Sequence, residues 1–426
     1  MRSLFLFALI FLSACATTYE NAAKRSWNLM KDGKVDEALK IYEKDVTSDK
    51  EKLLRLMDEG ILLRVGKRYK ESNEKFFAAA KIIDLSGYIS LGEQSVTLLT
   101  NEKQTVYQGE DFEKVLIHLY LGLNFLNLKN YEAALVETRK VNEILFKMIS
   151  ESARPYELNA FAKYLGALLF ENDRNDNDAL VSYRETLKLD PSLEQKFPVL
   201  GQDLMRILKR QGMTGELEEF KKKFGNESWE KAKKSLDNRD GAAVLLFESG
   251  KSPEKYSSRE RHLKAGKGGT LLEVAIPVAY YKNRPTQIQS AILSVGGQKA
   301  QTVILNDIER TAIEQLKDRM GRAMAKALLT AGVKAGIATG IGKATNNSDL
   351  GVLAGIALFL SSEADTRSWL LLPGELQVAK IFLAPGKYQA KVFYIDGSGK
   401  DLGSEVIPDV EIKSNRNTFI QSRSLD

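Results

Sequence analysis

The chain has 426 residues, of which 43% are hydrophobic and 28% charged, and its formal net charge is +6. This composition is typical of a globular protein and is sufficient for two or three domains. One cysteine and two histidines exclude an internal disulfide framework and a thiolate zinc cluster, and the mild, dispersed positive charge gives no basis for nucleic-acid binding.

The first residues have the order of a bacterial export signal. Arg2 precedes a short apolar run over residues 4–12, and small residues then lead to Cys15. The run is shorter than the roughly 20 apolar residues that span a bilayer. Residues 12–15, Leu-Ser-Ala-Cys, resemble the lipobox, in which the cysteine is lipidated and becomes the mature N-terminus. We therefore predict a signal peptide at 1–14, cleavage before Cys15, and lipidation of Cys15.

The residue after this cysteine bears on localisation. It is Ala16 rather than the aspartate that, by resemblance to the enterobacterial sorting rule, favours retention in the inner membrane. More than one acyl chain on Cys15 gives lasting membrane attachment. We expect an outer-membrane lipoprotein that faces the periplasm, and the sequence leaves the leaflet open.

Helix-period sequence continues to about residue 224 and contains a recurring pattern. A glycine at Gly122 or Gly166 precedes an alanine at Ala134 or Ala179, and the second copy ends at Pro191. Two looser copies contain Gly33, Ala38 and Tyr42, and Tyr69, Ser72, Phe76 and Ala79. These spacings resemble the tetratricopeptide repeat, a helix–turn–helix unit of about 34 residues.

Close packing explains the pattern. The small residues let the two helices of a unit approach, and larger ones such as Tyr42, Phe76 and Tyr183 fill the space to the next unit. Pro191 ends its repeat because proline cannot continue a helix. We predict an N-terminal TPR-like α-solenoid over residues 15–230, with a loop or extra helix at 86–105 and a capping pair within 204–224.

A solenoid of this kind presents a concave groove to a protein or peptide partner. The first helices of the repeats are expected to line the groove, around Leu62, His118 and Asn124. His118 lies in an apolar helical run, where we expect a packed or partly exposed residue at the edge of the core.

Beyond residue 230 the sequence becomes strand-like, which predicts a β-rich domain over residues 231–426. Strands are expected at 243–247, 271–281, 288–295, 376–383, 388–394, 410–413 and 418–421. We predict a small antiparallel sheet in a β-sandwich-like module, with a type II turn at Pro385-Gly386. The segment 251–269, which includes His262, has little periodicity and several positive charges. A solvated basic loop is favoured over a contact with anionic lipid head groups.

A helical insertion is predicted at about 306–362. Gly332, Gly336 and Gly340 fall four residues apart within it, and glycines at 351 and 355 repeat the spacing. Small residues at this spacing permit close helix contact, so we predict a packed, glycine-rich helical hairpin. A membrane-inserting hairpin is disfavoured because the apolar run at 350–360 is far shorter than a span.

No catalytic residue, metal site or cofactor is predicted. Gly342-Lys343 resembles the end of a phosphate-binding loop, but Ile337 and Ala344 stand where the motif requires glycine and Ser or Thr. Paired carboxylates on the helices are explained as solvated faces.

Asp365, Arg367 and Trp369 form a polar and aromatic group just before a strand. We favour a structural role for these three residues over a ligand site, with Arg367 pairing with a carboxylate or stacking on Trp369.

Several blocks together carry a family resemblance. The most specific is residues 365–370, Asp-Thr-Arg-Ser-Trp-Leu, and the segments 137–140, 161–165, 245–253 and 284–285 add to it. With these blocks the chain resembles a family of uncharacterised bacterial tetratricopeptide-repeat-containing lipoproteins. The resemblance implies secreted, lipid-anchored, non-enzymatic proteins. Their genes neighbour a lipoprotein activator of penicillin-binding proteins in several bacteria, which associates the family with cell-envelope assembly.

The sequence therefore predicts an α+β protein that acts as an interaction scaffold in cell-envelope assembly or maintenance. Its partners would be the membrane, through lipidated Cys15, and a protein or peptide in the repeat groove, for which the cell-wall synthesis machinery is the candidate. The first alternative is a homo-oligomeric structural component that uses the glycine-rich hairpin. An envelope hydrolase has the least support, because it rests on unassigned carboxylates alone.

Overall fold

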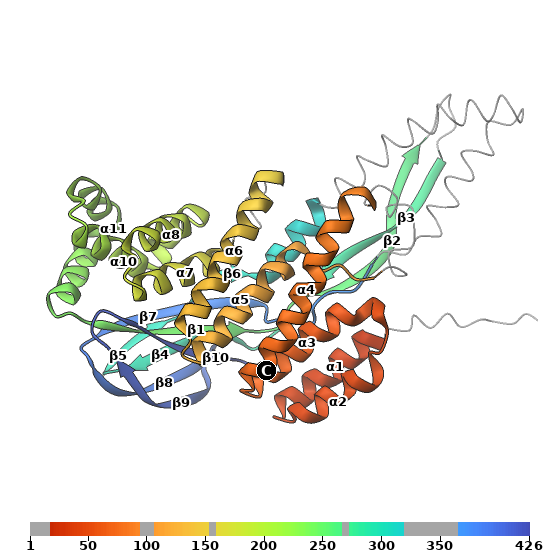
Figure 1. Cartoon of the computed structure of the whole chain (residues 1–426), viewed down its shortest axis with the longest axis horizontal. Helices are drawn as coiled ribbons and strands as arrows, with labels where there is room; N and C mark the ends of the chain where they lie inside the picture. The colour runs from red at the N-terminus through yellow and green to blue at the C-terminus, as the bar shows by residue number, and fades with distance from the viewer. Residues whose placement is uncertain (1–17, 94–105, 153–158, 266–271, 319–364) are drawn as a thin grey trace, which may run out of the picture.

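The computed structural model describes residues 18–93, 106–152, 159–265, 272–318 and 365–426. The lipobox with Cys15 and the glycine-rich segment 331–359 lie outside the described residues. Within them, an array of helices lies along one side of the molecule and two packed sheets lie beneath it (Figure 1). A two-stranded ribbon projects from the end near the first helices.

The described helices form five antiparallel pairs, accompanied by the short helices η1 (Asp49–Glu51) and α9 (Leu193–Lys196). In chain order the pairs are α1 (Thr18–Lys31) with α2 (Val35–Asp45), α3 (Lys52–Val65) with α4 (Tyr69–Glu93), α5 (Asp111–Asn127) with α6 (Tyr131–Ser152), α7 (Ala160–Asn172) with α8 (Asp176–Leu189), and α10 (Pro198–Arg210) with α11 (Thr214–Asp237). The second helix of the second pair extends well into the predicted insert at 86–105.

The turn inside every pair has the same geometry. The second residue after each first helix has positive φ, and the next helix begins two residues later. Two backbone N–H groups at each turn donate to carbonyl oxygens of the last helical turn, which is the Schellman arrangement. The five positive-φ residues are Gly33, Lys67, Lys129, Arg174 and Gly212. This recurrence establishes a helical-repeat architecture from the chain's own geometry.

Small residues at the repeat positions do pack closely, although not always within one pair. A Cβ on Gly166 would lie 2.9 Å from Thr138 Cγ2 of the preceding pair, whereas the nearest atom to a Cβ on Gly122 would be 3.8 Å away, on α6. The alanines at 134 and 179 are fully buried. Gly166 therefore serves the contact between pairs, and Gly122 leaves room to spare.

Sheet A has the strand order β10 (Asn417–Arg423), β1 (Gly241–Ser249), β7 (Glu375–Leu383), β6 (Val303–Asp307). The first strand, β1, is buried along its whole length because both of its faces are covered. Ala242, Val244 and Leu246 belong to the core shared with the helices, while Leu245 and Phe247 point to the other sheet. Sheet A is thus the middle layer of three.

Sheet C forms the outer layer, with the order β5 (Gln298–Gln301), β4 (Ile288–Val295), β8 (Gly386–Asp396), β9 (Asp401–Ile412). Its inward side chains, among them Leu293 and Val392, pack on sheet A in a separate hydrophobic core. The projecting ribbon pairs β2 (Glu254–Ala265) with β3 (Leu272–Lys282). Helical residues 308–318 follow β6.

Three local predictions are wrong. Most of the segment 251–269 is strand β2 rather than a loop, because pairing with the apolar β3 supplies the order that its own sequence lacks. Gly386 does not have positive φ and begins β8, so the type II turn is absent. The last strand, β10, pairs in parallel with β1, so sheet A is mixed rather than antiparallel.

Candidate functional site

The concave side of the helical array is occupied by the chain itself. The first helix of every pair, α1, α3, α5, α7 and α10, makes polar contacts with sheet A or with residues 365–373, here called the strap, which lead into β7. Buried carboxyl groups on these helices provide most of the contacts. The candidate site is therefore this interface, and its chemistry changes from one end of the array to the other.

At the N-terminal end, Asp58 on α3 holds the strap. Its Oδ1 accepts a hydrogen bond from Leu371 N at 3.2 Å, and its Oδ2 accepts from the hydroxyls of Tyr42 at 2.6 Å and Tyr19 at 2.9 Å. Tyr19 Oη also accepts from Leu370 N at 3.2 Å. Burial raises the pKa of Asp58 to about 7, although the hydrogen bonds from the two tyrosines oppose the increase.

Glu113 on α5 also holds the strap, at Trp369 rather than at Leu371. Its Oε1 accepts from Trp369 N at 2.8 Å, and its Oε2 accepts from Tyr107 Oη at 2.7 Å. The Oε2 also accepts from Glu110 N at 2.9 Å and so closes a capping box at the start of α5. Burial, together with the charge of Glu110, raises the pKa of Glu113 to about 7.

The strap carries the three residues singled out from the sequence. Arg367 Nη2 lies 2.8 Å from Asp365 Oδ2, and its guanidinium carbon is 5.3 Å from the centre of the Tyr107 ring. Trp369 is 1% exposed and packs against Tyr120 at 5.8 Å between ring centres. Arg367 therefore pairs with a carboxylate, as expected, and stacks on the ring of Tyr107.

In the middle of the interface, Arg64 on α3 reaches sheet A. Its Nη2 lies 2.8 Å from Glu248 Oε1 on β1 and 2.6 Å from Gln421 Oε1 on β10, while its Nη1 donates to Asn124 Oδ1 at 2.9 Å. Tyr120 Oη donates to Glu248 Oε2 at 3.1 Å. Burial opposes ionisation of Glu248, but the positive charge of Arg64 lowers its pKa below the usual value.

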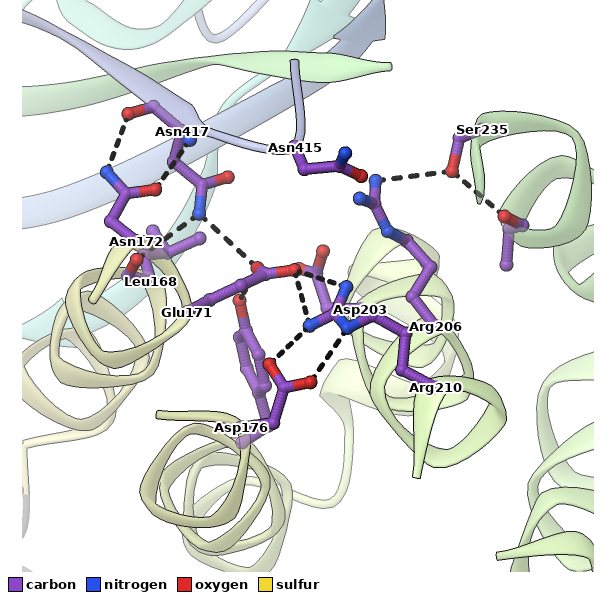
Figure 2. A network of polar contacts seen from close by, with 12 residues as sticks. Leu168, Glu171, Asn172, Asp176, Asp203, Arg206, Arg210, Ser235, Asn415 and Asn417 are labelled. Carbon is purple, nitrogen blue, oxygen red and sulfur yellow. Dashed lines mark hydrogen bonds and ion pairs between the residues drawn. The ribbon is translucent and has the colours of Figure 1, made fainter. Parts of the chain in front are cut away.

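At the C-terminal end the buried groups are charged pairs (Figure 2). The ammonium of Lys380 on β7 is fully buried and lies 2.6 Å from Asp203 Oδ1 on α10. Glu171 on α7 faces Arg210 at 3.2 Å and also accepts from Tyr183 Oη at 3.0 Å. Burial of Glu171 is outweighed by the charges of Lys380 and its arginine neighbours, and the pKa falls to about 2. The pKa of Asp203 is raised by burial despite the nearby ammonium.

The same end also contains an amide clamp, visible in Figure 2. Asn417 N donates to Asn172 Oδ1 at 2.7 Å, and Asn172 Nδ2 donates back to Asn417 O at 2.9 Å. The side-chain amide of Asn172, the last residue of α7, thus makes the two backbone hydrogen bonds that a neighbouring strand would make with the first residue of β10.

None of the three residues expected to line a partner groove lies on an open surface. Leu62 and Asn124 are fully buried, and Asn124 donates to Ser72 Oγ at 2.8 Å as well as accepting from Arg64. His118 is 11% exposed at its side chain, with Nδ1 2.7 Å from Glu137 Oε2. Leu62 and Asn124 therefore do not line an open groove, because sheet A and the strap fill the concave side. A partner role for these residues stays a prediction.

The charged residues that hold the interface were not found from the sequence. Their signal is a charge on an otherwise apolar face, as with Lys380 inside the strand 375–383 and Asp58 inside the apolar helix 52–65. Such a charge is costly to bury unless it is paired, so it implies a partner elsewhere in the chain. The partner's identity is not visible, because the contacts of these groups with sheet A and the strap join segments far apart in the chain.

The described ranges show no grouping of three His, Cys, Asp or Glu side chains able to hold a metal ion. None of the helices in the part of the chain that the structure describes is long and apolar enough to cross a membrane.

No protein-family model and no curated protein matches the chain. Among solved structures, it is similar to the MamA protein, with 16% identity over 52% of this chain and 94% of that chain at a TM-score of 0.32. MamA from Desulfovibrio magneticus RS-1 gives 18% identity over 52% and 98% of the two chains at a TM-score of 0.31.

A putative kinesin light chain with nearly identical TPR-like repeats from Podosopora anserina gives 12% identity over 53% and 99% of the two chains, at a TM-score of 0.33. The repeat architecture rests on the helix pairs and turns described above.

Proposed function

We propose that this protein is an outer-membrane lipoprotein, anchored through Cys15 and facing the periplasm, that acts as a protein–protein interaction scaffold in cell-envelope assembly or maintenance. The lipobox at residues 12–15 supports the anchor. The scaffold role is supported by the repeat array, an architecture that offers extended surface for partners.

The proposal rests on a difference between the first and the second helix of each pair. The first helices bind the chain's own sheet and strap, so the second helices are the face of the array left to a partner. Large exposed apolar side chains occur on these second helices: Phe77 on α4 (42% exposed), Val136 and Phe146 on α6 (47% and 70%), and Val181 on α8 (49%). Contiguous exposed apolar surface is typical of interaction sites, and we propose that these side chains contribute to one. We therefore place the partner surface on α4, α6 and α8.

The anchor is tested by the Cys15→Ala variant. We expect it to leave the membrane fraction, because lipidation supplies the attachment, while its circular dichroism spectrum and urea midpoint stay unchanged. Retention of the variant in the membrane pellet after a carbonate wash contradicts the anchor. Loss of the circular dichroism signal instead indicates that Cys15 has a role in folding.

The partner surface is tested by photo-crosslinking in intact envelopes, with a photoreactive amino acid at position 136 or 146. An affinity tag belongs in the exposed turn at 397–399, because the Asp426 side chain at the C-terminus accepts a hydrogen bond from Ile288 N at 3.0 Å. The matched control carries the photoreactive residue at Val406, which is 52% exposed on β9. We expect positions 136 and 146, and not 406, to capture a protein of the envelope-assembly machinery. Capture of the protein itself favours the homo-oligomeric alternative, and equal capture at all three positions contradicts the assigned surface.

A further inference from the structure

Three cationic side chains surround one indole ring at the N-terminal end of the molecule. Lys251 Nζ lies 5.2 Å from the centre of the Trp27 ring, and the guanidinium carbons of Arg423 and Arg284 lie 5.7 Å and 5.9 Å from it. These cations come from the end of β1, the end of β10 and the segment before β4, so the fold brings them together on α1. One cation satisfies a cation–π contact, and three on one ring repel one another.

Neutral oxygen atoms hold the two guanidinium groups in place. Arg284 Nε donates to Ser252 O at 2.5 Å, and its Nη2 donates to Leu370 O at 2.6 Å. Arg423 Nη2 donates to Leu371 O at 2.5 Å. Both arginines are thereby fixed by backbone carbonyl groups, which orient the positive charges without neutralising them.

The carboxylates nearest to the cluster are engaged elsewhere. Glu248 Oε2 is 3.5 Å from Arg423 Nη1, but the same carboxylate forms the shorter ion pair with Arg64. Glu254 pairs with Lys24 at 2.7 Å. Asp426 accepts hydrogen bonds from the segment 286–288. The cluster therefore keeps an excess of positive charge.

Hydrogen-bond donors in the cluster also lack acceptors. Among the described residues, Nε of Arg423 and Nε1 of Trp27 have no hydrogen-bond partner, and Nη1 of Arg423 makes no hydrogen bond beyond its 3.5 Å ion-pair contact with Glu248 Oε2, although the Arg423 side chain is only 9% exposed. Buried donors without acceptors are rare in folded proteins. All three atoms are donors, so the group that would satisfy them is an acceptor.

The pKa values point the same way. The pKa of Lys251 is lowered by burial and by the positive charges of Arg284 and Lys31, against the opposing effect of Asp426. The pKa of Arg284 is lowered by burial. An anion placed among these groups would offset the mutual repulsion of their positive charges.

We propose that Lys251, Arg284 and Arg423 form, beside Trp27, a binding site for a phosphoryl group, supplied either as free phosphate or as a phospholipid head group. A phosphoryl group suits the site better than a carboxylate because it carries more acceptor oxygens and up to two negative charges. Lys31 is exposed, and Lys251 and Arg284 are half-buried. The proposal is independent of the scaffold function.

The first test titrates inorganic phosphate into the lipidated protein in neutral detergent, with chloride and acetate at equal ionic strength as comparisons. We expect saturable binding by calorimetry, and a tryptophan fluorescence change that disappears in Trp27→Phe. Lys251→Gln should weaken phosphate binding about tenfold, which corresponds to the loss of one charge-assisted hydrogen bond. This variant avoids the buried arginines and is expected to fold normally.

The matched control is Lys299→Gln, which removes a lysine that lies 5.6 Å from a single aromatic ring, that of Phe393, on sheet C. It should bind phosphate as the unmodified protein does. Equal binding by the Lys251→Gln variant, or an equal response to acetate, would overturn the assignment of a phosphoryl site.

The second test distinguishes the two sources. The Cys15→Ala chain, which lacks the lipid anchor, is mixed with vesicles of phosphatidylcholine alone or with added phosphatidylglycerol. Binding to the phosphatidylglycerol vesicles that inorganic phosphate displaces and Lys251→Gln weakens supports the head group. Binding of inorganic phosphate without vesicle binding supports free phosphate. Absence of both responses refutes the site.

Discussion

The two ends of the interface between the array and sheet A do the same structural work with opposite electrostatics. At the N-terminal end, Asp58 and Glu113 receive hydrogen bonds from tyrosine hydroxyls and from backbone N–H groups of the strap, all of which are neutral donors. At the C-terminal end, Glu171 and Asp203 face Lys380 and Arg210. The pKa is raised to about 7 for the first two carboxyls and lowered to about 2 for Glu171.

The difference shows that burial alone does not decide the state of a carboxyl group. All four side chains are buried. Where the donors are neutral, the desolvation penalty raises the pKa of Asp58 and Glu113. Where cations lie nearby, their charge outweighs this penalty for Glu171. The N-terminal end, where the strap is attached, should therefore change its stability as the pH approaches about 7. At the C-terminal end, Glu171 should remain charged over the same range.

The largest expected effect comes from removing the buried cation. Lys380→Met leaves Asp203 and Glu171 without their ammonium, and we expect the free energy of unfolding to fall by about 3–5 kcal/mol. Urea denaturation at pH 7.5 measures the loss. The control Lys413→Met removes an exposed lysine, 3.7 Å from Glu411, and should change stability by less than about 0.5 kcal/mol. A loss below about 1 kcal/mol for Lys380→Met would mean that the C-terminal end does not depend on charge pairing.

The next effect is a fall in stability between pH 4 and pH 7. The pKa of Asp58 is higher in the folded protein than its ordinary 3.8, so the folded state binds the proton more tightly. Its contribution is full below about pH 4 and is lost as the pH rises towards 7, by about 1.4 kcal/mol per pH unit in this window. Asp58→Asn should flatten this part of the stability curve. An unchanged slope in the variant would show that Asp58 does not titrate in the folded protein.

At the other end the sign is reversed over a narrower window. The pKa of Glu171 is lower in the folded protein than its ordinary 4.5, so its contribution is full above pH 4.5 and is lost as the pH falls towards 2. Glu171→Gln should reduce the loss of stability between pH 4.5 and pH 3, by about 1.4 kcal/mol per unit at most. Urea midpoints at pH 4.5 and pH 3 measure this loss of stability. The control is Glu143→Gln on the exposed face of α6. Equal behaviour of both variants would contradict the pairing.

The smallest effect concerns the helices that connect the two ends. Gly122→Ala has space for the new methyl group and should gain up to about 1 kcal/mol from helix propensity. In Gly166→Ala the methyl group would meet Thr138 Cγ2 at 2.9 Å, which cancels that gain. Thermal unfolding of the two variants measures the difference. If both variants are equally stabilised, the contact between α6 and α7 is softer than the distance suggests.

Much of the local structure follows from the sequence. The helix pairs come from apolar spacing and small residues such as Ala38, Ala134 and Ala179, all of which are fully buried. Strand positions such as Ile288–Val295 follow from alternation of apolar and polar residues. These signals are readable because each residue's neighbours within a turn or a pleat determine the outcome.

Other features have no local signal. Lysine or arginine occupies three of the five positive-φ turn positions, where glycine would have marked the turn. The strand β2 depends on β3, and the parallel pairing of β10 with β1 joins segments that are far apart in the chain. These features arise because tertiary partners compensate for weak or unfavourable local preferences.

The sequence by itself determined that this chain would form a helical array followed by strands, since periodicity is written into neighbouring residues. Only the tertiary structure decided what fills the concave side of the array. Arg64, Asp58, Glu113 and Lys380 are buried charges or carboxyls whose partners lie on distant segments, and a buried polar group is stable only where its partner is brought to it. That pairing places the chain's own sheet and strap where an open groove was expected.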